Sequence, residues 1–178
     1  MPPMKKIGKE KILEAAFDIV NEYGIKNLNT RLIAKKLNCS TQPIFSEYKN
    51  MEELKQELKE KIHKYHEEYL CQNLDKDHPY RTTGENYIKF AKEKPNLFNA
   101  IFVDEKLEDK KYEDVIEELK ISTGLNEREA NSFHQIMWFY THGIASLVAN
   151  NTIKLTDDQI KELLSIEFRA LMLLEGKK

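Results

Sequence analysis

Residues 30–54 read TRLIAKKLNCSTQPIFSEYKNMEEL, and the helix and turn signals in this stretch decide the fold. Apolar residues recur at helical spacing up to Leu37, and Asn38-Cys39-Ser40 then predicts a turn. Ser40 or Thr41 can cap the next short helix, with Pro43 in its first turn, where a missing N–H loses no intrahelical bond. Two short helices joined by a three-residue turn predict a helix-turn-helix, a motif whose second helix enters the major groove of DNA.

The flanking sequence continues the helical pattern in both directions. A helix over about 5–23 is predicted to stop at Gly24, and a long charged helix is predicted to start after Asn50. Capping sequences at Asn126 and Thr156 open two further helices, and no segment shows the period-two alternation of a strand. We therefore predict an all-α protein of about nine helices. A three-helix helix-turn-helix domain is expected over residues 1–50, and a helical ligand-binding and dimerisation domain over residues 51–178.

Composition favours a helix-rich globular protein without the common enzyme motifs. Of the 178 residues, 33% are charged and 40% apolar, and the 6 glycines lie too far apart for a phosphate-cradling or dinucleotide-binding loop. The sequence has no GxSxG motif, and its two cysteines lack the spacing of metal ligands. We expect no catalytic residue, no metal site and no cofactor. No apolar run approaches the length of a membrane span, so we expect a cytoplasmic protein that does not contact a membrane.

Charge is distributed unevenly along the chain. Residues 1–50 hold nine Lys and Arg against five Asp and Glu, a net charge of +4, whereas the whole chain carries −2. A basic end suits a polyanion such as DNA, because neutralising phosphates supplies most of the non-specific affinity for nucleic acid. The alternative is a solvated helix face, which has the same composition.

Three segments of the N-terminal part carry a family resemblance. Residues 11–24 and residues 30–37 look like a first and a second helix, and Asn38-Cys39-Ser40 stands where a Gly-Val-Ser turn is usual. Residues 44–54, IFSEYKNMEEL, match the pattern Leu-Tyr-x-x-Phe-Lys-x-Lys-Glu-x-Leu. Together these segments resemble the TetR family of bacterial transcriptional regulators. The resemblance implies a DNA-binding domain at the N-terminus and does not identify the operator.

The predicted reading helix begins with the small and polar groups that base reading requires. It also departs from the family pattern, because Phe45 replaces a tyrosine that commonly binds phosphate, Met51 replaces a commonly basic residue, and Glu47 adds an acid. Phosphate contacts are then expected from Lys49, Tyr48 or Thr30. The predicted DNA-binding residues are Thr30, Ser40, Thr41, Gln42, Pro43, Ile44, Ser46, Tyr48 and Lys49.

The last two predicted helices, over 127–150 and about 157–175, are apolar on more than one side. A surface helix of a monomer needs a single apolar stripe, so two such helices in sequence predict a second buried contact. The alternative is a pair of central helices in a monomer core. The predicted dimer interface contains Met137, Tyr140, Ile144, Leu147, Ile160, Leu164, Phe168 and Leu171.

The second half of the chain carries a further resemblance. Residues 87–98, YIKFAKEKPNLF, with Trp138 and the pair His142-Gly143, are similar to a TetR C-terminal class named for its Trp-His-Gly signature. This implies an effector-binding and dimerisation half whose last two helices pair as a four-helix bundle across a two-fold axis. Aromatic side chains here suit an apolar pocket with His142 as its orienting polar group, although core filling explains each of them equally well. The predicted effector-binding residues are Tyr87, Phe90, Phe98, Phe102, Phe133, Trp138 and His142.

These patterns favour one function over two alternatives. The first interpretation is a homodimeric regulator that binds double-stranded DNA, most simply a repressor released from a palindromic operator by a small, largely apolar effector. The alternative is a protein-interaction adaptor that keeps a degenerate helix-turn-helix, suggested by Glu47 and Met51. A helical-bundle enzyme is third, because the sequence offers no set of nucleophile, base and orienting group.

Overall fold

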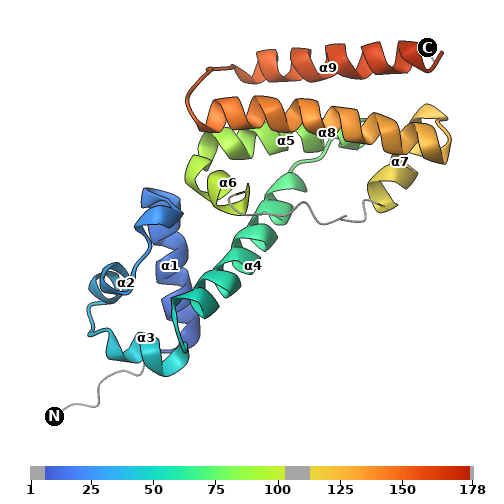
Figure 1. Cartoon of the computed structure of the whole chain (residues 1–178). Helices are drawn as coiled ribbons and strands as arrows, with labels where there is room; N and C mark the ends of the chain where they lie inside the picture. Colours follow the sequence, from blue (N-terminus) through green and yellow to red (C-terminus); the bar gives the residue numbers. More distant parts are fainter. Residues whose placement is uncertain (1–6, 103–112, 177–178) are drawn as a thin grey trace. The chain divides into compact units, whose positions relative to one another are not determined.

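The computed structural model describes residues 7–102 and 113–176, in which all regular structure is helical (Figure 1). In this part of the chain no helix is both long enough and apolar enough to cross a membrane. The helices are α1 (Lys9–Tyr23), the 3₁₀ turn η1 (Ile25–Asn27), α2 (Thr30–Lys36), α3 (Gln42–Glu47), α4 (Met51–Leu70), α5 (Pro79–Glu93), α6 (Pro95–Phe102), α7 (Glu113–Thr123), α8 (Glu127–Ala149) and α9 (Asp157–Leu174). The prediction of an all-α protein with about nine helices is confirmed.

Several helix ends lie where local sequence signals predicted them. Gly24 follows α1 with φ of 81°, and Asn38 follows α2 with φ of 51°, both in the left-handed region that these residue types tolerate. Asn126 and Thr156 form capping boxes at the starts of α8 and α9. The cap predicted for α3 is absent, because Thr41 precedes this helix with helical dihedral angles and makes no side-chain capping bond.

The described residues form two compact units. The first contains residues 7–67 and 94–102, so most of α4 and all of α6 join the helix-turn-helix, and the second contains residues 68–93 and 113–176. The predicted boundary after residue 50 separates a DNA-binding domain from a ligand-binding and dimerisation domain. This functional division stays a prediction.

In the first unit, α1 packs against α2, α3 and α6. Its apolar stripe includes Ile12 and Ile19, which are buried. The ring of Phe17 meets the edge of Tyr65 on α4, with 5.3 Å between ring centroids. Asn96 of α6 donates to the carbonyl oxygens of Asn21 and Glu22 at 3.0 and 3.1 Å, which satisfies acceptors at the end of α1. The helices α1, α4 and α6 therefore form a packed support for the helix-turn-helix.

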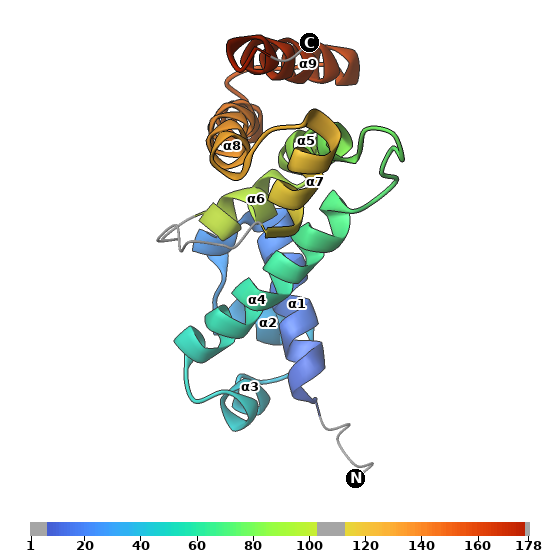
Figure 2. The same cartoon turned by 90° about the vertical axis from the view of Figure 1, so that its right-hand side faces the viewer.

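In the second unit, α5 packs against α8 and α9, and α7 packs against α8. Figure 2 looks roughly along α8 and α9 and shows them as neighbouring helices. Gly84 of α5 lies close to α9, since a Cβ at this position would sit 3.4 Å from a methyl carbon of Leu164. Phe133 of α8 and Phe168 of α9 meet edge to face, with 5.0 Å between ring centroids. This unit has a core of its own.

Candidate functional site

The second helix of the helix-turn-helix, α3, presents a small mixed surface. Gln42, Phe45 and Ser46 are exposed, and the Phe45 side chain keeps 53% of its surface. The Ser46 hydroxyl donates to the Gln42 carbonyl oxygen at 3.0 Å, which fixes the hydroxyl and leaves its oxygen able to accept. An amide, an aromatic ring and a hydroxyl are therefore available on one short helix, in keeping with the base-reading role predicted for Gln42 and Ser46.

Two residues of the predicted DNA-binding set lie inside the first unit. Ile44 and Tyr48 are each 1% exposed, so their side chains hold α3 in place and do not reach the surface. The Lys9 ammonium lies 5.0 Å from the centre of the Tyr48 ring and pairs with Glu57 of α4 at 2.6 Å. Burial, reinforced by the Glu57 carboxylate, raises the pKa of the Tyr48 hydroxyl above its usual value.

The remaining predicted DNA-binding residues surround α3. Ser40 and Lys49 are exposed, and Thr30, Thr41 and Pro43 are half-buried. The Lys49 backbone N–H donates to the Glu53 carboxylate at 2.7 Å, and the Glu53 N–H donates to the Asn50 side chain at 2.9 Å. These bonds fix the chain between α3 and α4, so Lys49 projects from an ordered segment.

Three residues of the predicted effector set lie together in the second unit. In the second unit, the Tyr87 hydroxyl lies 2.9 Å from Nδ1 of His142, and the Trp138 ring stacks on the imidazole with 5.4 Å between centroids. Burial lowers the pKa of His142 below its usual value. Phe133 packs instead with Tyr80 and Phe168, and Phe90 packs with Tyr69.

Two predicted effector residues, Phe98 and Phe102, belong to the first unit. They pack against each other on α6, with 4.8 Å between ring centroids.

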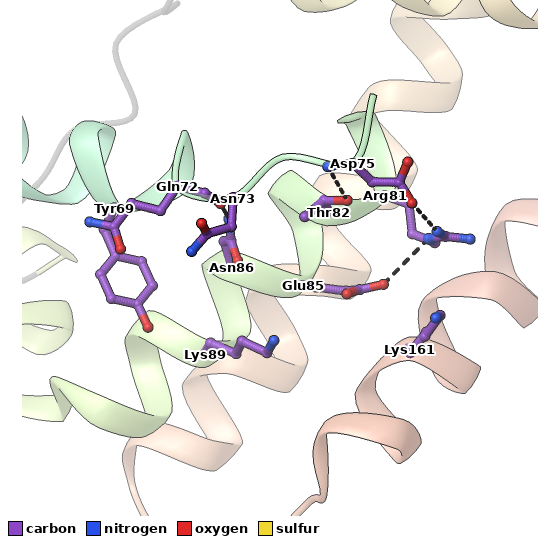
Figure 3. A pocket seen from close by; sticks show the side chains of 10 residues that line it. All are labelled: Tyr69, Gln72, Asn73, Asp75, Arg81, Thr82, Glu85, Asn86, Lys89 and Lys161. Carbon is purple, nitrogen blue, oxygen red and sulfur yellow. Dashed lines mark hydrogen bonds and ion pairs between the residues drawn. The ribbon is translucent and has the colours of Figure 1, made fainter. Parts of the chain in front are cut away.

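A polar pocket lies in the second unit, and its lining contains no residue of the predicted effector set (Figure 3). Its volume is about 340 Å³. The wall contains the end of α4, the segment between α4 and α5, one face of α5 and one residue of α9. The lining residues are Tyr69, Gln72, Asn73, Asp75, Arg81, Thr82, Glu85, Asn86, Lys89 and Lys161. Sequence reasoning did not find this pocket, although the charged row Arg81, Glu85 and Lys89 at four-residue spacing was a visible signal.

Most of the predicted dimer interface is buried inside a single chain. The buried members are Met137, Ile144, Ile160, Leu164 and Leu171. The helix α5 packs against both α8 and α9, as the contact of Gly84 with Leu164 illustrates. Tyr140 and Phe168 are half-buried, and Leu147 is exposed.

Six large apolar side chains of α8 and α9 stay exposed in the single chain. We call this set the exposed α8–α9 face, and it contains Ile136, Phe139 and Leu147 on α8 and Ile166, Leu173 and Leu174 on α9. The spacing of Ile166 and Leu173 already marks a helical stripe, but the sequence does not say which of two neighbouring stripes faces solvent.

Comparison with known proteins places this fold among transcriptional regulators. No protein-family model and no curated protein matches the sequence. A TetR-family regulator from Vibrio parahaemolyticus matches with a TM-score of 0.65 and 16% identity, over 91% of this chain and 97% of that one. A TetR-like regulator from Rhodococcus sp. RHA1 matches with a TM-score of 0.62 and 17% identity, over 98% of this chain and 99% of that one.

A third solved structure agrees. TetR from Acinetobacter baumannii AYE matches with a TM-score of 0.64 and 15% identity, over 96% of this chain and 97% of that one. A variant of TetR from the same organism, solved in complex with minocycline, matches with a TM-score of 0.62 and 16% identity, over 96% of this chain and 98% of that one. These matches confirm the fold that the predicted resemblance implied: over 91–98% of its length, this chain has the fold of TetR-family transcriptional regulators.

Proposed function

We propose that this protein is a dimeric, DNA-binding regulator of transcription whose hold on DNA responds to a small molecule. The observation that carries the proposal is the helix-turn-helix of the first unit, with the side chains of Gln42, Phe45 and Ser46 exposed on α3. A helix with exposed amide, hydroxyl and apolar groups matches the hydrogen-bonding and methyl groups that base pairs present in a major groove.

The proposed DNA contacts are a subset of those predicted from sequence. Gln42 and Ser46 would contact base edges, Phe45 the methyl group of a thymine, and Lys49 a phosphate. Ser40, Thr41, Pro43 and Thr30 border this surface. Ile44 and Tyr48 are left out because both are buried.

The acid that suggested an adaptor instead of a DNA-binding protein, Glu47, is half-buried. The pKa of Lys9 is raised mainly by its hydrogen bond to Glu57, and the charges of Glu53 and Glu47 add to this effect while burial opposes it. The Lys9 cation therefore offsets part of the negative charge that Glu47 would present to DNA.

We place the dimer contact on the exposed α8–α9 face. A soluble chain that exposes six large apolar side chains on two neighbouring helices gains free energy by burying them. Two-fold pairing places the same residues of both subunits against each other. A dimer would present two α3 helices, as a palindromic DNA site requires.

The proposed effector site is the cluster of Tyr87, Trp138 and His142. Two aromatic rings and a half-buried imidazole offer apolar surface and one polar group, as small-molecule sites commonly do. The minocycline complex of the Acinetobacter protein supports a ligand-binding role for this fold in general. Ligand binding would weaken DNA binding only if the two states of the dimer bind the ligand with different affinity.

Point variants on a duplex bound by the wild-type protein test the DNA contacts. Gln42→Ala should cost about 1–3 kcal/mol on the preferred sequence and much less on random DNA, because a base contact carries sequence information. Lys49→Ala should weaken binding to all sequences alike and reduce the slope of log affinity against log salt by about one unit per subunit. Lys26→Ala, which removes an exposed lysine of η1, is the matched control. Equal losses for Lys26→Ala and Lys49→Ala would contradict the proposed surface.

A further inference from the structure

The polar pocket of the second unit has an excess of positive charge that its own acids do not balance. Arg81 is placed between the two carboxylates of the wall, with Nη2 at 3.1 Å from Asp75 and Nε at 3.4 Å from Glu85 (Figure 3). Asp75 also accepts the backbone N–H of Asp77 at 2.9 Å. Both carboxylates of the pocket wall are therefore already paired with Arg81.

The wall of the pocket also contains two lysines. Lys89 extends from α5 and Lys161 from α9, and both line the pocket; in Figure 3 the Lys89 side chain points toward the α9 side of the pocket and the Lys161 side chain points toward Arg81. Among the residues that the structure describes, neither ammonium group forms an ion pair or a hydrogen bond. Both lysines add positive charge to the lining of one small pocket, and this charge attracts an anion.

The pocket also offers neutral donors and little apolar surface. The side-chain amides of Gln72 and Asn73 line it, and within the described chain they make no other hydrogen bond. Asn86 is held as part of the wall, because its amide donates to the carbonyl oxygens of Leu70 and Gln72 at 3.0 and 2.7 Å. The only aromatic ring in the wall is Tyr69, which packs on Phe90. A volume of about 340 Å³ suits a small ligand.

We propose that this pocket binds a small oxyanion with two negative charges, a phosphate group or a dicarboxylate, between Lys89 and Lys161. Ammonium groups form charge-assisted hydrogen bonds to such oxygens, and the two amides supply further donors. The site differs in chemistry from the proposed aromatic effector site and shares no residue with it. The inference concerns a second ligand and does not depend on DNA binding.

Titration of the full chain with inorganic phosphate and, separately, with succinate tests the proposal, with ionic strength held constant by sodium chloride. Calorimetry measures the affinity, and the NMR signals of the lysine side chains locate the ligand. We expect saturable binding of at least one of the two anions, with the signals of Lys89 and Lys161 shifted and that of Lys154 unchanged. Binding of phosphate alone identifies a phosphate-bearing ligand, and binding of succinate alone identifies a dicarboxylate.

Lysine variants then test the site. Lys89→Gln and Lys161→Gln should each weaken binding about tenfold, the loss of one charge-assisted bond, and Lys161→Arg should retain most of the affinity. Lys154→Gln removes an exposed lysine outside the pocket and should change nothing. The proposal is overturned if neither anion saturates at millimolar concentration, if chloride competes equally well, or if Lys154→Gln weakens binding as much as the pocket variants.

Discussion

Truncation of Leu173 tests the proposed dimer most sharply, because this side chain contributes to the exposed α8–α9 face and to little else. Leu173 is 71% exposed in the single chain. Full burial of a leucine side chain contributes about 1.5–3 kcal/mol, so burying the exposed part contributes roughly 1–2 kcal/mol. The two-fold axis doubles this contribution, and alanine retains a fraction of the area. Leu173→Ala should therefore weaken the dimer by about 2–3 kcal/mol, or roughly 30- to 150-fold in dissociation constant.

Sedimentation at nanomolar to micromolar concentrations measures this change directly. Ile121→Ala on α7 is the matched control, because Ile121 is 78% exposed and lies outside the exposed α8–α9 face. We expect the control to dimerise like the wild type. The unfolding free energy of the isolated Leu173→Ala chain should change by less than about 0.5 kcal/mol, as for other exposed positions. A wild-type monomer at micromolar concentration, or equal weakening by Ile121→Ala, would refute the reasoning.

Three further predictions concern the bases, the effector and pH. If Phe45 contacts a thymine methyl group, replacing that thymine by deoxyuridine should weaken DNA binding by the wild-type protein and leave DNA binding by Phe45→Ala unchanged. Fluorescence anisotropy measures both affinities. Equal effects on both proteins would contradict the proposed contact. Trp138 fluorescence should report effector binding. His142→Ala should weaken effector binding while the DNA affinity without effector stays the same. A melting temperature lowered by several degrees would instead identify His142 as a core residue. Burial lowers the pKa of His134 below its ordinary 6.5, so the unfolded chain takes up the proton more readily and stability should fall as the pH drops below about 6.5. His134→Gln should reduce this pH dependence in thermal melts, and an unchanged slope would exclude His134 as one of its sources.

Local signals predicted the helices well, because each depends on a few neighbouring residues. Asn38 and Gly24 adopt the left-handed backbone that their types favour, and Asn126 and Thr156 cap helices through bonds to residues three positions away. Local reasoning was wrong about the cap at Thr41. The helix α3 begins without a side-chain capping bond, with Pro43 in its first turn and Ile44 buried.

Features that depend on tertiary packing were harder to predict. Leu164 and Ile166 both belong to apolar stripes on α9, and α5 packs against the stripe of Leu164 while that of Ile166 stays exposed. Tyr48 is predicted from sequence as a phosphate contact, but it is buried, and the Lys9 ammonium of α1 lies over its ring. The polar pocket needs Lys161 of α9 beside α5, a proximity that no sequence spacing encodes.

Selection from a pool of random DNA duplexes, followed by sequencing of the bound fraction, tests the central claim most directly. A dimer with two exposed α3 helices should enrich an inverted repeat whose half-sites lie about one helical turn, or a multiple of it, apart. Gln42→Ala should lose this enrichment at defined positions of each half-site. A bound pool without any enriched sequence, at salt concentrations where wild-type binding is still measurable, would contradict the account.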